Sequence, residues 1–587
     1  MRMRTFVLST LASAVLVTSG CNSADPNSFE AHLPKLEQPD ERGPAFTELQ
    51  RLVKSIASSD NAERKKEFAE KVTPVFAKIW DEAPEHRIAM LEMMRDIATS
   101  SAEGDQIWSK AIVLDGTTEA RQGALIALQG IRAAKANGVA PALREALDKM
   151  VEDPSNDNGE PAGEVRLEYI KTIGTLRDKE AEPVLLKVLA QSHETQPVPV
   201  HKQAVEALVE IGATSNEAVD ALLAIQFQVP DSPGTQSVGE RAVRALAGIG
   251  EPAVPRALDM LKGKIEAVNK AAAENGVDLL ITHQFAVKVL GAIGSDKATE
   301  DLVAFMPTDD CVAGAEIKSV EDMDAAQVGL RAVVARSLGE IGDPKAAEAL
   351  CGCRDATHNA GDLWEITMAL GRIGGDTAFE CLSKIVTEGE YNPEDLPNSD
   401  FRYEIRWEGA RFMVLAGGPD NVDAMRKAIA DQSDAKVKEN IGKWEDGIAT
   451  LEKCKADKAC YKDVVTDPAA KWFAREVAAV HYAKLGMGEK DVALDISHAF
   501  KVRDPGARVT MALLAAEVMQ GEGCHECADA LDAVMDSESG SAKPEMQAAW
   551  ITARQSAVKL RRGDPPAAAA AAPAEGAAPA EGEKPAE

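Results

Sequence analysis

Apolar residues in the middle of the chain recur every three or four positions, the spacing of one helix face. The first predicted helix carries this face on Leu330, Val334, Leu338 and Ile341. Gly342 follows at the point where helices commonly end in the left-handed conformation, which glycine adopts without strain. The pattern therefore predicts a helix that stops at Ile341.

A second helix is predicted directly after this stop. Asp343 can cap its first turn, and Pro344 can open it because proline lacks only an N–H that has no partner there. Ala346, Ala347 and Leu350 give this helix a small apolar face. The resulting hairpin has more apolar surface than it can bury alone, so we expect it to stack on copies of itself.

The same arrangement recurs along the chain at spacings typical of paired-helix repeats. The last apolar residue of each predicted first helix falls at Leu176, Ile211, Ile249, Ile293, Ile341, Ile373 and Ala416. Gly339 is expected to remove a side chain where the two helices of its hairpin approach closely. We therefore predict an all-α fold, an α-solenoid of stacked antiparallel helix pairs.

The segment Leu338–Leu350 reads leucine-glycine, one residue, isoleucine-glycine, aspartate-proline and then an alanine-rich helix. It resembles the HEAT-like repeats first grouped with phycobilin lyases. The resemblance covers residues 115–430 well and residues 470–540 weakly. It implies a HEAT/armadillo-like superhelix but little about function, because such repeats serve scaffolds, adaptors and a few enzymes.

In a stack of this kind, the second helices are expected to line one continuous concave face, because each lies beside its predecessor with a small rotation. Lys345, Glu348, Glu300 and Arg256 would then project near that face or its rim. We expect a protein partner of unknown identity to bind on this concave face.

Composition divides the chain into segments that differ in how much apolar surface they can bury. We predict a lipoprotein signal peptide at residues 1–20, a flexible tether at 21–43, the solenoid at 44–560 and a disordered Ala/Pro/Glu tail at 561–587. Within the solenoid, residues 44–115 lack the Ile-Gly signal, as terminal caps of solenoids often do. A helical insertion at about 431–468 breaks the period.

The N-terminus has the features of a secretory leader. Arg2 and Arg4 precede an apolar run from Phe6 to Val17, too short to span a bilayer as a mature anchor. The run ends in Thr18-Ser19-Gly20-Cys21, which resembles the bacterial lipobox, although the position three before the cysteine is usually leucine and here is threonine. The resemblance implies that Cys21 carries lipid and anchors the protein to a bacterial envelope membrane, facing the periplasm or the cell surface. The alternative is an ordinary signal peptide whose Cys21 forms a disulfide.

The formal net charge of the chain is −30. No basic cluster is dense enough to neutralise phosphates, so nucleic acid and anionic lipid surfaces are poor partners. The acidity favours a partner with a basic patch, whose association would weaken as salt rises. The alternative is that acidity only keeps a large protein soluble.

Eight cysteines remain if Cys21 is lipidated, and disulfides are the default in an exported chain. We predict four pairs: Cys454–Cys460 across a short turn, Cys524–Cys527 at a helix start, and Cys311–Cys353 and Cys351–Cys381 between neighbouring second helices. The pair at 524 and 527 could instead be redox-active. A haem site is excluded there because Ala528 stands where c-type attachment needs histidine.

The sequence offers no catalytic constellation, metal-ligand spacing or cofactor motif. His193-Glu194 and His525-Glu526 resemble the pairs of HEAT-type di-iron hydroxylases, but the two do not fall at equivalent repeat positions. Three hypotheses remain: a membrane-tethered interaction scaffold of the cell envelope, an enzyme of the lyase-like or hydroxylase-like branch, and a purely structural envelope component.

Overall fold

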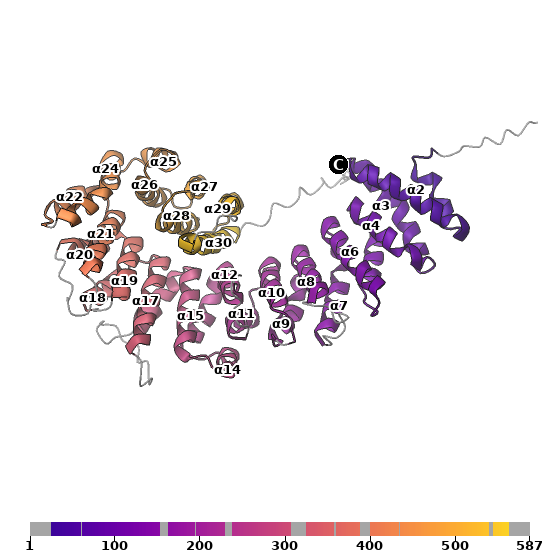
Figure 1. Cartoon of the computed structure of the whole chain (residues 1–587), viewed down its shortest axis with the longest axis horizontal. Coiled ribbons are helices and arrows are strands. Elements are labelled where there is room, and N and C mark those ends of the chain that lie inside the picture. Colours follow the sequence, from indigo (N-terminus) through magenta and orange to yellow (C-terminus); the bar gives the residue numbers. More distant parts are fainter. Residues whose placement is uncertain are drawn as a thin grey trace, which may run out of the picture. The chain divides into compact units, whose positions relative to one another are not determined.

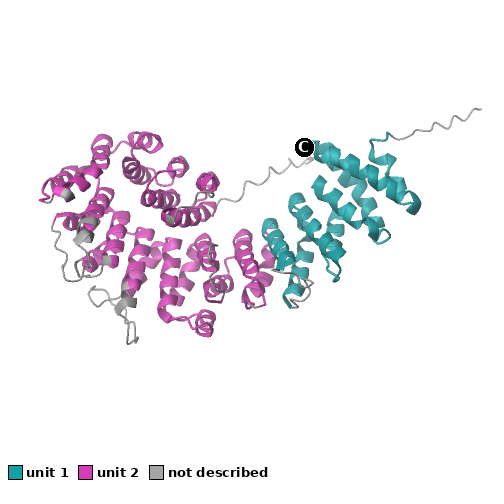
Figure 2. Cartoon of the chain, viewed as in Figure 1, with its two compact units in different colours: residues 1–176 teal, residues 177–587 magenta. Residues whose placement is uncertain are grey.

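The computed structural model describes residues 25–59, 61–152, 163–193, 195–228, 237–306, 324–356, 360–387, 399–433, 435–519, 521–538 and 544–562. Every regular element in these ranges is a helix, which confirms the all-α prediction. The chain divides into two compact units, residues 1–176 and 177–587 (Figure 2).

Unit 1 is a stack of helix pairs. Its helices are α1 (Leu33–Leu36), α2 (Pro39–Ala57), α3 (Ala62–Ile79), α4 (Arg87–Ile97), α5 (Ala102–Ala111), α6 (Thr118–Ala134), α7 (Ala140–Glu152) and α8 (Glu164–Leu176). Helices α2, α4, α6 and α8 pack on one another in that order, and α3 packs on α5. The two layers share a core of leucine, isoleucine, valine and phenylalanine.

Unit 2 contains two layers of helices. The first helices of its pairs are α10 (Val198–Ile211), α12 (Val238–Ile249), α15 (Leu279–Ile293), α17 (Asp324–Ile341), α19 (Ala360–Ile373), α21 (Ser399–Ala416), α26 (Trp472–Leu485), α28 (Pro505–Val518) and α30 (Gln547–Arg561). The second layer comprises α9 (Glu182–Ala190), α11 (Asn216–Gln228), α13 (Val254–Leu261), α14 (Glu266–Glu274), α16 (Thr299–Phe305), α18 (Ala346–Ala356), α20 (Gly375–Thr387), α22 (Val422–Ala430), α27 (Lys490–Ala499) and α29 (His525–Glu538). In the region predicted as an insertion lie α23 (Ala435–Ile441), α24 (Glu445–Cys454) and α25 (Lys458–Thr466).

From α12 onward, the first helices of unit 2 form a closed ring. Each packs on the next from α12 through α15, α17, α19, α21, α26 and α28 to α30, and α30 then packs back on α12 (Figure 1). We call these helices the ring and the α12–α30 contact the seam. The second-layer helices lie outside the ring (Figure 1). The sequence predicts a solenoid, but the closure of its C-terminal part is a feature that the repeat pattern does not reveal.

Small residues make the seam possible. A Cβ added to Gly248 would lie 2.4 Å from Cγ1 of Val558, and one added to Gly250 would lie 1.4 Å from Nη1 of Arg562. Val558 is short and belongs to α30, so a larger residue at position 248 would push α30 away from α12, whereas the long side chain of Arg562 could move aside from position 250. The glycine-rich end of α12 therefore serves two purposes, ending the helix and receiving α30.

The predicted ends of the first helices agree with the structure. Helices α8, α10, α12, α15, α17, α19 and α21 end at Leu176, Ile211, Ile249, Ile293, Ile341, Ile373 and Ala416. Gly342 follows α17 with φ +76°, the left-handed value expected from the motif. Asp343 then accepts a hydrogen bond from the backbone N–H of Lys345 at 3.1 Å, opening the turn into α18.

The predicted role of Gly339 needs a correction. A Cβ at this position would lie 2.7 Å from Cα of Ala369, which belongs to α19, the first helix of the next pair. The close approach is therefore between successive first helices and not within one hairpin. Gly291 and Gly371 occupy the same place in α15 and α19, against Ser337 and Phe412.

This close packing also corrects the predicted concave face. Glycine brings the first helices nearer together, so the stack curves toward that layer, and the first helices line the inside of the ring. Lys345, Glu300 and Arg256 lie in the outer layer, where Lys345 pairs with Glu300 at 3.8 Å and Arg256 pairs with Asp220 at 2.5 Å. Glu348 is also on an outer helix, α18.

The predicted tether at residues 21–43 differs from the structure over its described part. Phe29 and Leu36 are fully buried, Phe29 packs edge-on against Phe68, and α2 begins at Pro39. Pro34 and Pro39 stand in first turns of helices, where proline is favoured. The folded part of unit 1 therefore begins before residue 44.

Replacing Gly339 with alanine should destabilise the ring. The new methyl group meets α19 backbone, and overpacking of this kind costs roughly 1–3 kcal/mol even after the gain in helix propensity. Gly352 is a matched control, because it also lies inside a helix but has no atom within 4 Å of an added Cβ. Gly352→Ala should raise stability by ~0.5–1 kcal/mol. Chemical denaturation measures both, and equal effects would contradict the assignment of Gly339.

Candidate functional site

The inside of the ring holds two cavities on either side of Glu340. The first, about 600 Å³, lies between the α15, α17 and α19 wall and the N-terminal halves of α28 and α30. The second, about 870 Å³, lies where α15, α17, α28 and α30 end. Glu340 lines both cavities. We call the first the N-terminal mouth and the second the C-terminal mouth.

Charged side chains meet where the two mouths adjoin. Oε2 of Glu340 lies against Gly291, at 2.7 Å from an added Cβ, and Nζ of Lys559 lies against Gly294, at 2.8 Å. Arg336 in α17 is paired with Glu365 in α19, with Nε 3.1 Å from Oε2. Gly291 in α15 and Gly294 directly after it thus admit an acid from α17 and a base from α30 to the inner wall.

Confinement alters the acid–base properties of these groups. Burial raises the pKa of Glu340, although the positive charge of Arg372 acts to lower it. Burial also lowers the pKa of Lys559 to about 8, although the negative charge of Glu340 acts to raise it. Both side chains nevertheless keep partial contact with solvent. A narrow, water-accessible space between protein walls has this effect: the two side chains contact some water but are largely desolvated.

Each mouth is lined by one exposed apolar side chain. Among the described residues, the large apolar side chains that are well exposed are Val113, Leu279, Ile281, Leu485 and Met487. Ile281 lines the N-terminal mouth, and Leu279 precedes it in the first turn of α15. Met487 lines the C-terminal mouth, two residues after Leu485. Clustered exposed apolar residues mark surfaces that contact other molecules.

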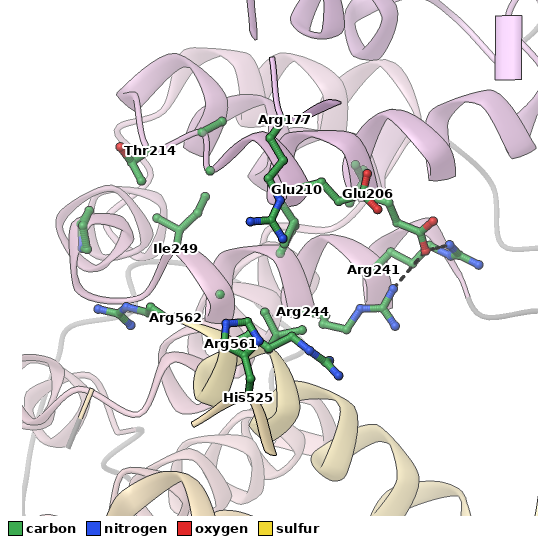
Figure 3. Close-up of a pocket in the computed structure, with 18 residues that line it drawn as sticks. Arg177, Glu206, Glu210, Thr214, Arg241, Arg244, Ile249, His525, Arg561 and Arg562 are labelled. Atoms are coloured by element: carbon green, nitrogen blue, oxygen red, sulfur yellow. Dashed lines mark hydrogen bonds and ion pairs between the residues drawn. The ribbon is translucent and has the colours of Figure 1, made fainter. Parts of the chain in front are cut away.

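A third cavity, about 700 Å³, lies beside the seam between α10, α12 and the end of α30 (Figure 3). Its lining includes five arginines and two glutamates: Arg177, Arg241, Arg244, Arg561, Arg562, Glu206 and Glu210. We call it the arginine pocket. Figure 3 shows Arg177 pointing across the cavity towards the end of α30. A concentration of cations is unexpected in a chain with a net charge of −30.

This pocket is not evident from the sequence, for two reasons. Residues 561 and 562 were assigned to the tail, whereas α30 ends at Arg561, and Arg562 lines both the arginine pocket and the C-terminal mouth. The remaining arginines come from α12 and from the turn before α9, which no local motif connects. The Arg-Arg pair after a helical stretch was the available signal.

The structure brings together three of the four predicted cysteine pairs. Cys351–Cys381, Cys454–Cys460 and Cys524–Cys527 form disulfides, with Cα–Cα distances of 5.9, 5.3 and 5.3 Å. Cys353 is buried, but its predicted partner Cys311 lies outside the described residues, as does Cys21. The Cys311–Cys353 pairing and lipid attachment at Cys21 therefore stay predictions.

The predicted histidine positions are separate sites. Nδ1 of His193 is 3.0 Å from the carbonyl oxygen of Gln228, whereas His525 lines the arginine pocket. Within the ranges that the structure describes, no group of three His, Cys, Asp or Glu side chains is placed to hold a metal ion.

These features define the class: an α-solenoid built from HEAT-like helix pairs. Residues 330–353, which span the end of α17 and most of α18, match the family model described as the PBS lyase HEAT-like repeat. The resemblance inferred from the sequence is thereby confirmed at this repeat. No curated protein matches the chain.

Solved structures with similar folds include an engineered protein, with 16% identity and a TM-score of 0.26, covering 72% of this chain and 98% of that one. The crystal structure of Kap121p has 13% identity and a TM-score of 0.25, covering 91% of this chain and 67% of Kap121p. A homology model of the AP-3 complex has 13% identity and a TM-score of 0.24, covering 91% and 89%. Scores this low say nothing about the ligands or partners of this chain.

An unreduced proteolytic digest should contain linked peptides for the three disulfides. Removing Cys351–Cys381 by double alanine substitution should cost more stability than removing Cys454–Cys460, because the enclosed loops differ, with sequence separations of 30 and 6. The chain-entropy model gives about 3.6 and about 2.2 kcal/mol, respectively. Free thiols at both cysteines of a pair in protein purified from an oxidising compartment would contradict that pair.

Proposed function

We propose that this protein is an interaction scaffold of the bacterial cell envelope, tethered to a membrane through lipid on Cys21, and that its ring binds a protein partner. HEAT-repeat solenoids are typical of such scaffolds. The observation that carries the proposal is that each mouth is lined by an exposed apolar side chain, Ile281 at one and Met487 at the other, with Leu279 and Leu485 exposed two residues earlier in the sequence.

The mouths combine properties expected of a protein-binding surface. Apolar side chains supply contact area, while charged groups such as Arg336 and Glu365 supply direction and specificity. Cavities of 600 and 870 Å³ are large enough to receive side chains of a partner. The chain-wide acidity still favours a partner that is basic overall.

The tether rests on the leader and on Cys21. Among the described residues, no helix combines the length and apolar character needed to cross a bilayer. The anchoring proposal therefore depends on the lipobox-like sequence and needs its own test.

Cys21→Ala should abolish labelling of the protein by radioactive palmitate in a bacterial host and move it from the membrane fraction to the soluble exported fraction. A diacylglyceryl group joined to this sulfur would be lost with it. Cys21→Ser serves as the nearly isosteric control and should behave like the alanine variant. If either variant stays in the membrane fraction with its leader removed, the lipid anchor is wrong.

A photoreactive amino acid at position 555 should cross-link to the partner in cells. Gln555 lines the N-terminal mouth and is partly exposed. The same substitution at Glu380, an exposed position on the outer helix α20, is the control. A reproducible adduct at position 555 and none at position 380 supports the ring as the binding surface. Equal labelling at both positions, or none, would contradict it.

A further inference from the structure

The cations of the arginine pocket are only partly neutralised by the protein. Arg241 and Arg244 share one carboxylate, Glu206: Arg241 forms an ion pair with it, and Nη2 of Arg244 is 3.2 Å from Oε1. Nε of Arg241 is buried and has no hydrogen-bond partner among the described residues, so this guanidinium has a donor for another acceptor.

The arginines at the end of α30 differ from each other. Arg561 bridges Asp529 and Asp532 on α29, at 2.8 and 2.5 Å. Arg562 and Arg177 have no ion pair within 4 Å among the described residues, and Arg177 is exposed. Two of the five cations thus have no close ion pair within the described ranges, and they stand on opposite sides of the cavity (Figure 3).

Burial makes the charges of Arg244 and Arg562 costly. Burial lowers the pKa of Arg244, although the negative charge of Glu206 acts to raise it. Burial likewise lowers the pKa of Arg562, although the negative charge of Glu251 acts to raise it. Arginine remains protonated in proteins, so the lowered pKa values report poor solvation of a charge that is present. A carboxylate placed between these groups would restore the lost solvation and form charge-assisted hydrogen bonds.

The pocket also has an apolar part. Val205, Val209, Ala245, Ile249 and Val558 line it between the arginines. A small inorganic anion would leave this surface uncovered. A peptide that alternates acidic and apolar side chains would use both the arginines and the apolar floor.

We infer that the arginine pocket binds a carboxylate-rich segment of the partner protein, with its acidic side chains on Arg177 and Arg562 and its apolar side chains on the floor formed by α10, α12 and α30. This inference rests on the proposed function, since it names the chemistry by which the scaffold recognises its partner. The arginine pocket would then bind acidic side chains, although the net negative charge of the whole chain favours a partner that is basic overall. The pocket then selects one segment rather than one protein surface.

The test uses the purified Cys21→Ala protein and a fluorescent 12-residue peptide that alternates glutamate and leucine. Binding is followed by fluorescence anisotropy, and a peptide with glutamine in place of glutamate is the ligand control. The glutamate peptide should bind at least about tenfold more tightly, as expected when charged hydrogen bonds are lost.

Arg177→Gln and Arg562→Gln should each weaken binding of the glutamate peptide by about tenfold, and the double variant should weaken it further. Arg426→Gln is the matched control, because it removes the same charge from the outer helix α22. Circular dichroism and thermal unfolding check that each variant is folded.

Equal affinity of the two peptides, equal affinity of all variants, or no binding of the glutamate peptide would each overturn the inference. Inorganic phosphate that binds with the same dependence on Arg177 and Arg562, while the peptide does not bind, would also overturn it and assign the pocket to a small anion. Cross-linking at position 555 distinguishes this inference from the proposed function. An adduct that persists in the Arg177/Arg562 double variant would contradict a role of the arginine pocket in partner binding and would still support the ring as the binding surface.

Discussion

The architecture of unit 2 depends on one contact, the packing of α30 on the glycine-rich end of α12. Gly248 and Gly250 leave room for Val558 and Arg562, and each of the three ring cavities has α30 residues in its wall. Without this contact the first helices would form an open arc. The charged groups on α30, Lys559 among them, would then face bulk water instead of the opposite wall.

The repeat pattern predicts the hairpins well because the signals involved are local. An apolar residue every three or four positions, a glycine at the helix end and a cap after it all lie within one turn of the feature they specify. Closure is different: it joins Gly248 to Val558, and it results from small rotations summed over many pairs. The side of curvature was mispredicted for a related reason, since Gly339 gave no sign of whether it faces its own hairpin or the next one.

The candidate sites were hidden because their residues are distant in sequence and ordinary in type. Glu340, Lys559 and Arg372 come from three helices, and each alone suggests a solvated surface residue. Net charge was also a poor guide to the site, because a chain with a charge of −30 concentrates arginines where three helices converge. Cysteine pairing was more accessible, since Cys454–Cys460 and Cys524–Cys527 span six and three residues.

Closure constrains how this architecture can change during evolution. An open solenoid can gain or lose a helix pair by duplication or deletion, because its ends accept a longer or shorter stack. A closed ring accepts only a fixed number of helix pairs at given packing angles. An added pair would separate α12 from α30 or change the packing angle between every two adjacent pairs. The Ile-Gly repeats between α12 and α21 can therefore diverge in sequence and in loop length, as their unequal spacings show, while their number is held by the geometry of the seam.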